Sequence, residues 1–346
     1  MADNSRIEWT DATWNPITGC SVLTAGCTNC YAMKLAGTRL QMHPSRAGLT
    51  DPTAAGPVWN GEVRLNAEWL DMPIRWSRRR MIFVCAHGDL FHPSVPDAWI
   101  DTVFGIMWAC LYGRNGEPGH IFQVLTKRAE RMHAYLSVDR REAWARAAVR
   151  FGGGHDPDGL YDQVALADGP HPRIWLGVTA ENQATADNRI PLLLHTPAAV
   201  RWVSAEPLLG PLDLAAYLMC LCGKCGGDAP LHWVVAGGES GPRARPMHEQ
   251  WVRGLRDQCA EASVPFLFKQ WGEWLPMGQQ ERSREYPEVV ADRANGAPAS
   301  GYPDTRVHVW SDGTESYRAG KRSSGRHLDG ALHDGYPVQG LAAGAS

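Results

Sequence analysis

The stretch Met81-Ile-Phe-Val-Cys-Ala-His-Gly-Asp89 is an apolar run that ends abruptly in polar residues. A short apolar run without alternation is typical of a strand that is buried on both faces. Helix-like stretches separate several runs of this kind, and strands that alternate with helices indicate a parallel sheet. The sequence therefore predicts an α/β fold. Five later runs have the same form, at 121–125, 174–178, 200–204, 232–236 and 265–268.

Charged residues follow most of these predicted strands. The carboxyl ends of parallel strands are where β/α barrels and open α/β sheets build their active sites. Charges of both signs suit a polar ligand, and we expect two or three of them to pair with each other. The charged residues are Lys127, Glu181, Glu206, Glu239 and Lys269. Helices are predicted between the strands, at 97–111, 130–149, 187–194 and 249–262.

The composition predicts a cytosolic protein. The formal net charge of −3 gives no general attraction to nucleic acid or to an acidic membrane. Residues 1–19 lack the apolar segment of a signal peptide, and no apolar run has the length of a membrane helix. A reducing cytosol keeps thiols free, so the nine cysteines indicate metal binding rather than disulfides. The basic run Arg75–Arg80 is interpreted as a solvated helix end, with phosphate contact as the alternative.

Cys20, Cys27 and Cys30 lie within eleven residues of one glycine-containing loop. Thiolates select zinc or iron–sulfur clusters. A structural zinc site needs four ligands, and His43, His87 or His92 could supply the fourth. A [4Fe–4S] cluster held by three thiolates would instead leave one iron open to a ligand. From the residues alone, both interpretations remain open.

A second cysteine group, Cys220, Cys222 and Cys225, has half the spacing of a zinc ribbon. It is a candidate second metal site, either a zinc knuckle or an auxiliary cluster, which His232 or Cys259 could complete. Free cysteines in a surface loop are the equally weighted alternative.

The first cysteine motif resembles the signature of the radical S-adenosylmethionine (radical SAM) superfamily, with six rather than three residues between its first two cysteines. Its Cys27–Tyr31 segment is also similar to spore photoproduct lyase, which acts on thymine in DNA. Ordered stretches over residues 8–275 resemble a phage and bacterial family grouped with radical SAM enzymes. These stretches are Trp14–Cys20, Gly26–Ala32, Asp89–His92, Leu125–Arg128, Ser204–Pro207, Gly237–Gly241 and Lys269–Gly272.

This resemblance implies a partial (β/α)6-type radical SAM barrel over residues 1–275, with insertions at about 41–70, 150–172 and 218–230. Residues 276–346 are expected to form a small C-terminal β appendage and a flexible tail. Within them, 306–310 and 315–318 flank Ser311-Asp-Gly-Thr314, which is a hairpin signal.

The resemblance also implies a [4Fe–4S] cluster on Cys20, Cys27 and Cys30, SAM bound at the open iron, and an electron donor that reduces the cluster. Asp89 is favoured over Glu239 for the SAM amino group, because Gly237-Gly-Glu239 follows a late strand, whereas this superfamily motif normally follows an early one. Asn29 stands where the superfamily usually has an aromatic residue, and Tyr31 follows instead. The expected cofactor-binding residues are Asp89, Tyr31, Glu181 and Glu239, and the catalytic candidates are Lys127, Glu206 and Lys269.

The substrate hypothesis is a modified thymine base in phage DNA, isomerised or cleaved in the host cytoplasm. Arg75–Arg80 would contact phosphate, and Trp271 and Trp274 would stack on a base. Two alternatives come from other classes of protein. One is a zinc-stabilised module that binds nucleic acid or protein without catalysis. The other is a metal-free barrel hydrolase that uses Glu181, Glu206 and Glu239.

Overall fold

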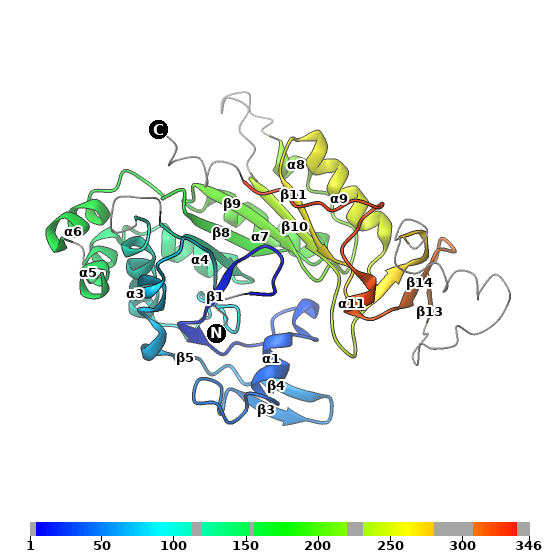
Figure 1. Cartoon of the computed structure of the whole chain (residues 1–346), viewed down its shortest axis with the longest axis horizontal. Helices are drawn as coiled ribbons and strands as arrows, with labels where there is room; N and C mark the ends of the chain where they lie inside the picture. The colour runs from blue at the N-terminus through cyan, green and yellow to red at the C-terminus, as the bar shows by residue number, and fades with distance from the viewer. Residues whose placement is uncertain (1–4, 113–118, 153–155, 220–230, 280–306, 338–346) are drawn as a thin grey trace. The chain divides into compact units, whose positions relative to one another are not determined.

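The computed structural model describes residues 5–112, 119–152, 156–219, 231–279 and 307–337 (Figure 1). The chain divides into two compact units. Unit 1 comprises Met1–Thr179, Asn188–Trp202 and Pro337–Ser346, and unit 2 comprises Ala180–Asp187 and Val203–Tyr336. This division differs from the boundary that the sequence predicted between residues 275 and 276.

Seven strands form one sheet in the order β1-β6-β7-β8-β9-β10-β11. The order follows the chain without reversal, as in a β/α barrel and unlike a doubly wound sheet. The mixed α/β class and a partial barrel therefore agree with the prediction. All six predicted runs are strands, and a short one precedes them. The bounds are β1 Ala12–Trp14, β6 Met81–Val84, β7 Ile121–Thr126, β8 Ile174–Thr179, β9 Val200–Ala205, β10 Trp233–Gly237 and β11 Phe266–Gln270.

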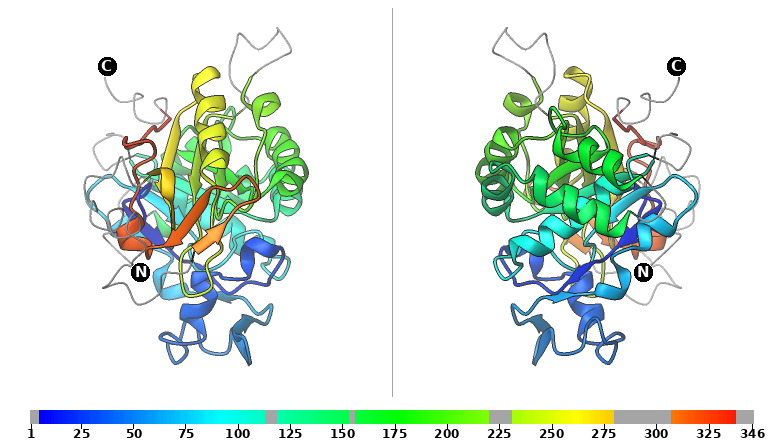
Figure 2. Two further views of the ribbon diagram at one scale, coloured as in Figure 1. Left: turned by 90° about the vertical axis from the view of Figure 1, so that its right-hand side faces the viewer. Right: turned by 90° about the vertical axis from the view of Figure 1, so that its left-hand side faces the viewer.

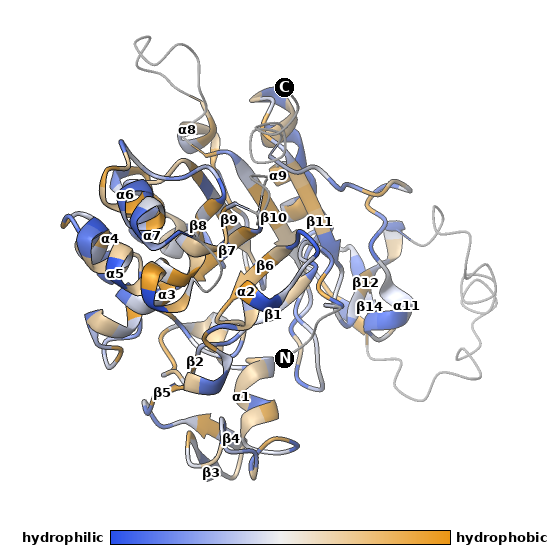
Figure 3. Cartoon of the chain, turned by 60° about the vertical axis from the view of Figure 1, so that its left-hand side comes forward, coloured by the Kyte–Doolittle hydropathy of each residue, from blue (hydrophilic) through white to orange (hydrophobic). Residues whose placement is uncertain are grey.

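In unit 1 the pairs β1–β6, β6–β7 and β7–β8 are all parallel. The pairing of β6 with β7 aligns Val84 with Val124. Both of these valines are fully buried, as the continuous apolar runs predicted. Figure 3 shows β6 and β7 mostly in the hydrophobic colour, whereas helices α4 and α5 carry a hydrophilic side. The strand ends therefore lie on a packed and rigid core.

The helices of unit 1 differ from the prediction at two places. The single helix expected at 130–149 is two helices, because the chain turns at Ser137–Arg140. The insertion at 150–172, expected to be a loop, contains a helix that begins with Asp156-Pro157. The helices are α2 Met72–Arg75, α3 Asp97–Ala109, α4 Ala129–Leu136, α5 Arg141–Phe151, α6 Pro157–Ala165 and α7 Gln183–His195, the last of which runs from unit 2 into unit 1.

The insertion at 41–70 is also more regular than expected. It contains an antiparallel hairpin, whose second strand packs against the short helix α1 (Figure 2, blue). A second antiparallel pair, β2 with β5, joins the start of the cysteine loop to the end of this insertion. The bounds are β2 Ile17–Thr18, α1 Tyr31–Ala36, β3 Thr50–Thr53, β4 Gly56–Trp59, β5 Arg64–Leu65 and η2 Ala67–Trp69.

In unit 2, β10 pairs with β11 in parallel, and helix α9 (Glu249–Glu261) packs against both strands (Figure 1). The predicted hairpin is confirmed as β13 (Val307–Val309) and β14 (Glu315–Arg318). Together with β12 (Trp274–Pro276), the hairpin forms a three-stranded sheet, so the appendage begins before residue 276. The remaining short helices of unit 2 are α8 Ala215–Leu218, η3 Met277–Gln279 and α11 Lys321–Ser324.

The chain after the hairpin is packed against β11, where a flexible tail was expected. The backbone N–H of Phe268 donates to His333, and that of Gly335 donates to Phe266. Residues 338–346 lie outside the described residues. Within the described ranges, no helix is both long and apolar enough to cross a membrane.

Candidate functional site

The cysteine motif occupies a loop that leaves β2 and ends at α1. Gly19, just before Cys20, has a φ angle of +96°, and a Cβ atom there would lie 2.1 Å from the carbonyl oxygen of Glu62. Only glycine satisfies both constraints. The loop then forms the short 3-10 helix η1 (Ala25–Cys27), and Cys30 is the N-cap residue of α1. Packing therefore fixes the start of the loop, and a helix fixes its end.

The three thiols lie within electrostatic range of one another. The pKa of Cys20 is raised to about 12, chiefly by burial, with contributions from the charge of Asp89 and from the neighbouring Cys30 and Cys27. The guanidinium of Arg128 acts in the opposite direction. A thiolate here needs a compensating positive charge, and a bound metal supplies such a charge.

Cys30 is surrounded by groups that donate to sulfur. Burial is the largest effect and raises the pKa of Cys30, whereas N–H groups of Met33, Ala32 and the Trp59 side chain lower it. Ala32, Met33 and Trp59 also belong to a buried apolar cluster against which Cys20 and Cys30 pack. N–H donors beside the sulfurs and apolar surroundings are the features through which proteins tune iron–sulfur clusters.

Three cysteine thiols in one loop are the kind of donor set that an iron–sulfur cluster uses. Among the residues that the structure describes, no three His, Cys, Asp or Glu side chains form a group that could hold a metal ion. In an iron–sulfur cluster each thiolate binds a different iron, so the sulfurs need not converge on one ion. The histidines considered as fourth zinc ligands have other partners: His43 Nδ1 lies 2.7 Å from Ser45 Oγ, His87 Nδ1 lies 3.4 Å from Arg46 Nε, and His92 Nε2 lies 2.9 Å from Ser21 Oγ.

Arg128 connects the cysteine loop to the ends of two strands. Its Nη1 atom lies 2.8 Å from Asp89 Oδ2 and 3.5 Å from Cys20 Sγ. Its Nη2 atom donates to the Ser21 hydroxyl at 2.8 Å and to the Ser21 carbonyl at 3.2 Å. Arg128 lies in the matching stretch Leu125–Arg128, but no role was predicted for it. The available signal was a cation directly after a strand end.

Asp89, the favoured contact for the SAM amino group, is buried and already engaged. Besides the ion pair with Arg128, its Oδ1 atom accepts from Thr126 Oγ1 at 2.7 Å and from the Phe91 N–H at 3.0 Å. The backbone N–H of Lys127 lies 3.3 Å from Oδ2. These contacts hold the carboxylate toward Arg128, and its contact with SAM stays a prediction.

Two further predicted residues of unit 1 lie near strand ends. Tyr31 is half exposed, and its hydroxyl donates to the Ala86 carbonyl at 2.7 Å. The edge of its ring meets His87. Lys127 extends from the end of β7 to β8, where its Nζ atom lies 2.8 Å from Thr179 Oγ1. Unit 1 thus holds the cysteine loop, Asp89, Tyr31 and Lys127.

In unit 2, Glu206 and Lys269 form an ion pair, with 3.1 Å between Oε2 and Nζ. Ser204 Oγ donates to the same carboxylate oxygen at 3.3 Å. A Cβ atom at Gly237 would lie 2.7 Å from Glu206 Oε1, so glycine at this position leaves room for the carboxylate. The expectation that some of the predicted charges pair with each other is confirmed for these two residues.

The other two acids of unit 2 lie near a cation that the sequence analysis missed. Arg245 donates through Nη2 to Glu239 Oε1 at 2.7 Å and through Nε to Oε2 at 2.9 Å. The pKa of Arg245 is raised chiefly by these hydrogen bonds, and the charge of buried Glu181 adds to the effect. Arg245 follows the Gly237–Gly241 stretch by four residues, and this proximity was the only signal.

Several other predictions have a structural outcome. Trp271 is buried, and its Nε1 atom donates to His327, so the prediction that it stacks on a base is wrong. Trp274 donates to Ala244 from β12. Arg75 pairs with Asp71, as expected for a solvated helix end. Cys85, Cys110 and Cys259 are buried and free, and the predicted second site at Cys220, Cys222 and Cys225 lies outside the described residues.

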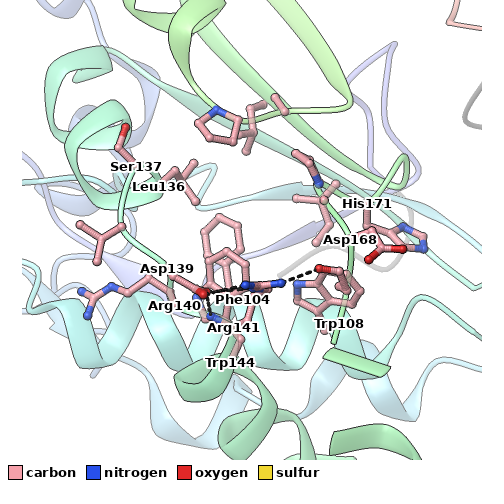
Figure 4. Close-up of a pocket in the computed structure, with 18 residues that line it drawn as sticks. Phe104, Trp108, Leu136, Ser137, Asp139, Arg140, Arg141, Trp144, Asp168 and His171 are labelled. Atoms are coloured by element: carbon pink, nitrogen blue, oxygen red, sulfur yellow. Dashed lines mark hydrogen bonds and ion pairs between the residues drawn. The ribbon is translucent and has the colours of Figure 1, made fainter. Parts of the chain in front are cut away.

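A cavity of 330 Å³ in unit 1 has none of the predicted residues in its wall. Phe104, Trp108 and Trp144 form its aromatic side (Figure 4). Its two arginines are already paired, Arg140 with Asp97 and Arg141 with Asp139. The cavity is therefore not assigned a role in the candidate site.

The comparisons with known proteins identify a family but no activity. A family model described as a protein of unknown function (DUF5131) matches residues 4–337. No curated protein and no solved structure matches the chain. Because the match extends over nearly the whole sequence, the chain belongs to the DUF5131 family.

Proposed function

We propose that this protein is a radical SAM iron–sulfur enzyme. The observation that carries the proposal is the cysteine loop. Three thiols share one loop, Cys30 has N–H donors around its sulfur, and the Arg128 guanidinium lies 3.5 Å from the sulfur of Cys20. Each of these features favours thiolates that bind a metal cluster. When bound, a reduced [4Fe–4S] cluster supplies the electron that cleaves SAM and so generates a 5′-deoxyadenosyl radical.

The chain's own residues would bind and orient the cofactors. Cys20, Cys27 and Cys30 would hold three irons and leave the fourth for SAM. Asp89 would keep Arg128 against the loop through their 2.8 Å ion pair. Tyr31 is half exposed beside the loop and is available to line the SAM site. We place this activity in the cytoplasm, where thiols stay reduced and a protein electron donor can act.

The charged groups of unit 2 would bind a polar ligand. Glu239 and Glu181 lie around Arg245, and this combination suits a ligand that carries both an amino and a carboxylate group. Glu206 and Lys269 form an ion pair. These two residues and Lys127 of unit 1 are the candidate catalytic residues. We propose a modified thymine base of phage DNA as the substrate, on the resemblance of the cysteine segment to a thymine-directed enzyme.

Anaerobic reconstitution with iron and sulfide tests the class of enzyme. The protein should bind about four irons at this loop and, once reduced with dithionite, should cleave SAM to 5′-deoxyadenosine. Stoichiometric zinc with no capacity for cluster assembly would favour the zinc-stabilised binding module. Hydrolysis of a substrate by metal-free protein would favour the barrel hydrolase.

A second experiment tests the substrate. Reduced enzyme and SAM are incubated with phage DNA, which is then digested to nucleosides and compared by mass and retention time. An isomerisation changes the retention time at constant mass, and a cleavage changes both. If free metabolites or peptides stimulate 5′-deoxyadenosine formation while modified DNA does not, the nucleobase proposal is wrong and the enzyme class is unaffected.

A further inference from the structure

We infer that Arg128 is a positioning residue, which fixes the first cysteine of the loop and sets the electrostatic environment of its sulfur. The inference concerns the same site and rests on the proposed function for its cluster-dependent part. Its other part, the fixing of the loop by Arg128, is a property of the metal-free chain.

The contacts of Arg128 divide between an anchor and a target. The anchor is Asp89, and both side chains of this ion pair are less than a tenth exposed. The target is the loop: one nitrogen of the guanidinium faces Cys20 Sγ at 3.5 Å, and the other donates to the Ser21 carbonyl and hydroxyl. A planar guanidinium can make these contacts at once, whereas a lysine ammonium lacks the fork.

The anchor itself is built by neighbouring strand ends. The register that aligns Val84 with Val124 carries Asp89 and Arg128 to the same edge of the sheet. Thr126 reinforces the arrangement, because its hydroxyl donates to Asp89 and accepts from the Arg128 N–H at 2.9 Å. Breaking a buried ion pair leaves an unpaired buried charge, so the geometry is strongly held.

A cation beside a cluster ligand has an electrostatic consequence. Reduction adds negative charge to a cluster, and a fixed guanidinium next to one thiolate favours the reduced form. Loss of Arg128 should therefore make the cluster harder to reduce. A purely structural arginine would change the stability of the loop but would leave the potential of an intact cluster unchanged.

The first experiment uses the full-length protein without metal. Hydrogen–deuterium exchange is followed in peptides that cover the cysteine loop in wild type, Arg128→Lys and Arg128→Met. Exchange should accelerate at least tenfold in both variants. Arg131→Met is the matched control, because Arg131 lies in α4 and pairs with Asp97 rather than with the loop. Unchanged exchange in the Arg128 variants would overturn the inference.

Ser21→Ala tests the inference even if the Arg128 variants fail to fold. It removes only the hydroxyl that Arg128 and His92 share, at 2.8 and 2.9 Å, and leaves the buried ion pair intact. It should accelerate exchange in the loop by a smaller factor than Arg128→Lys does. If Arg128→Met and Arg128→Lys both unfold, an unchanged loop in Ser21→Ala counts against the inference.

The second experiment measures the reduction potential of the reconstituted cluster by electron paramagnetic resonance. Among variants that still bind four irons, Arg128→Met should lower the ratio of reduced to oxidised cluster about tenfold, or ~59 mV for one electron. Arg128→Lys should lie between Arg128→Met and wild type. An unchanged potential would overturn the electrostatic part. If wild type assembles no cluster while loop exchange still responds to Arg128, the proposed function fails and the positioning role stands.

Discussion

Lys269, on the last strand of the sheet, pairs with Glu206, the residue that follows β9, at 3.1 Å between Nζ and Oε2. Their side chains are 18% and 15% exposed, so water screens the pair only in part. Removing one partner from such a pair leaves a partly desolvated charge without compensation. The effects of replacing Glu206 and Lys269 on the free energy of unfolding are therefore expected to be non-additive.

A double-mutant cycle measures this coupling. Glu206→Gln and Lys269→Met should each lower the free energy of unfolding by about 1–3 kcal/mol, and the double variant by less than the sum. Urea unfolding gives the four values. The exposed pair Arg146–Glu142 is the control, with an expected coupling of about 0–1 kcal/mol. Additive effects of Glu206→Gln and Lys269→Met would show that the two side chains act independently.

Iron binding should depend on the cysteine loop and not on the core cysteines. Replacing Cys20, Cys27 or Cys30 by alanine should reduce the iron of reconstituted protein from about four per chain to well under one. Cys110→Ala is the matched control, because Cys110 is buried and free in the described core. Iron content and absorbance check the result. Full iron content in any of the three loop variants would remove that cysteine from the ligand set.

The strands could be predicted from the sequence because burial on both faces leaves a continuous apolar run. The helix α6 was missed although Asp156-Pro157 is a strong start signal, with the Asp156 carboxylate accepting from the Gly159 N–H at 3.1 Å. The break between α4 and α5 has neither proline nor glycine within Ser137–Arg140, so it could not be predicted from these residue types.

The cysteine loop was also predictable from the sequence, because the spacing of its thiols is local. The contact between Asp89 and Arg128 was not, because it joins residues 39 positions apart and depends on the register of β6 with β7. The same holds for Glu239, whose partner Arg245 is close in sequence but is placed by a loop after the strand. Sequence patterns identified charged residues at strand ends, and only the structure determines their partners.

Asp329 should stabilise unit 2 through its arginines. It lies 2.6 Å from Arg253 Nη2 and 2.5 Å from Arg256 Nη1, and it thereby joins α9 to the chain after the hairpin. Asp329→Asn should cost about 1–2 kcal/mol at pH 7, because charge-assisted hydrogen bonds are lost. Asparagine tolerates the φ angle of +53° at this position, so backbone strain does not contribute. Asp257→Asn, at a mostly exposed partner of Arg256, is the control and should change little.

The effect of Asp329 should also depend on pH. Hydrogen bonds from Arg253, the largest effect, and from Gln279 and Arg256 hold the pKa of its carboxyl below the usual range. The folded state therefore binds a proton less readily than the unfolded chain, whose Asp titrates near ~3.9. The stabilisation is fully present above that value and is lost as the pH falls through the folded pKa. The difference between wild type and Asp329→Asn should narrow below about pH 4, and a constant difference would contradict this account.

His171, at the edge of the aromatic cavity of unit 1 (Figure 4), should remain neutral to unusually low pH. Its pKa is lowered to about 4, chiefly by burial and in part by the charge of Arg173. Its Nδ1 atom accepts from the Arg173 N–H at 3.2 Å, and the edge of its ring meets Trp108.

Because an unfolded chain protonates histidine near ~6.5, the unfolded state takes up this proton first as the pH falls. His171 should therefore make the free energy of unfolding decrease between about pH 6.5 and 4, with no further loss from this group at lower pH. His171→Gln should remove that part of the slope, which urea unfolding at several pH values measures. NMR titration of the His171 ring gives an independent value. A ring that titrates near ~6.5 in the folded protein would show that His171 is hydrated and does not contribute to the slope.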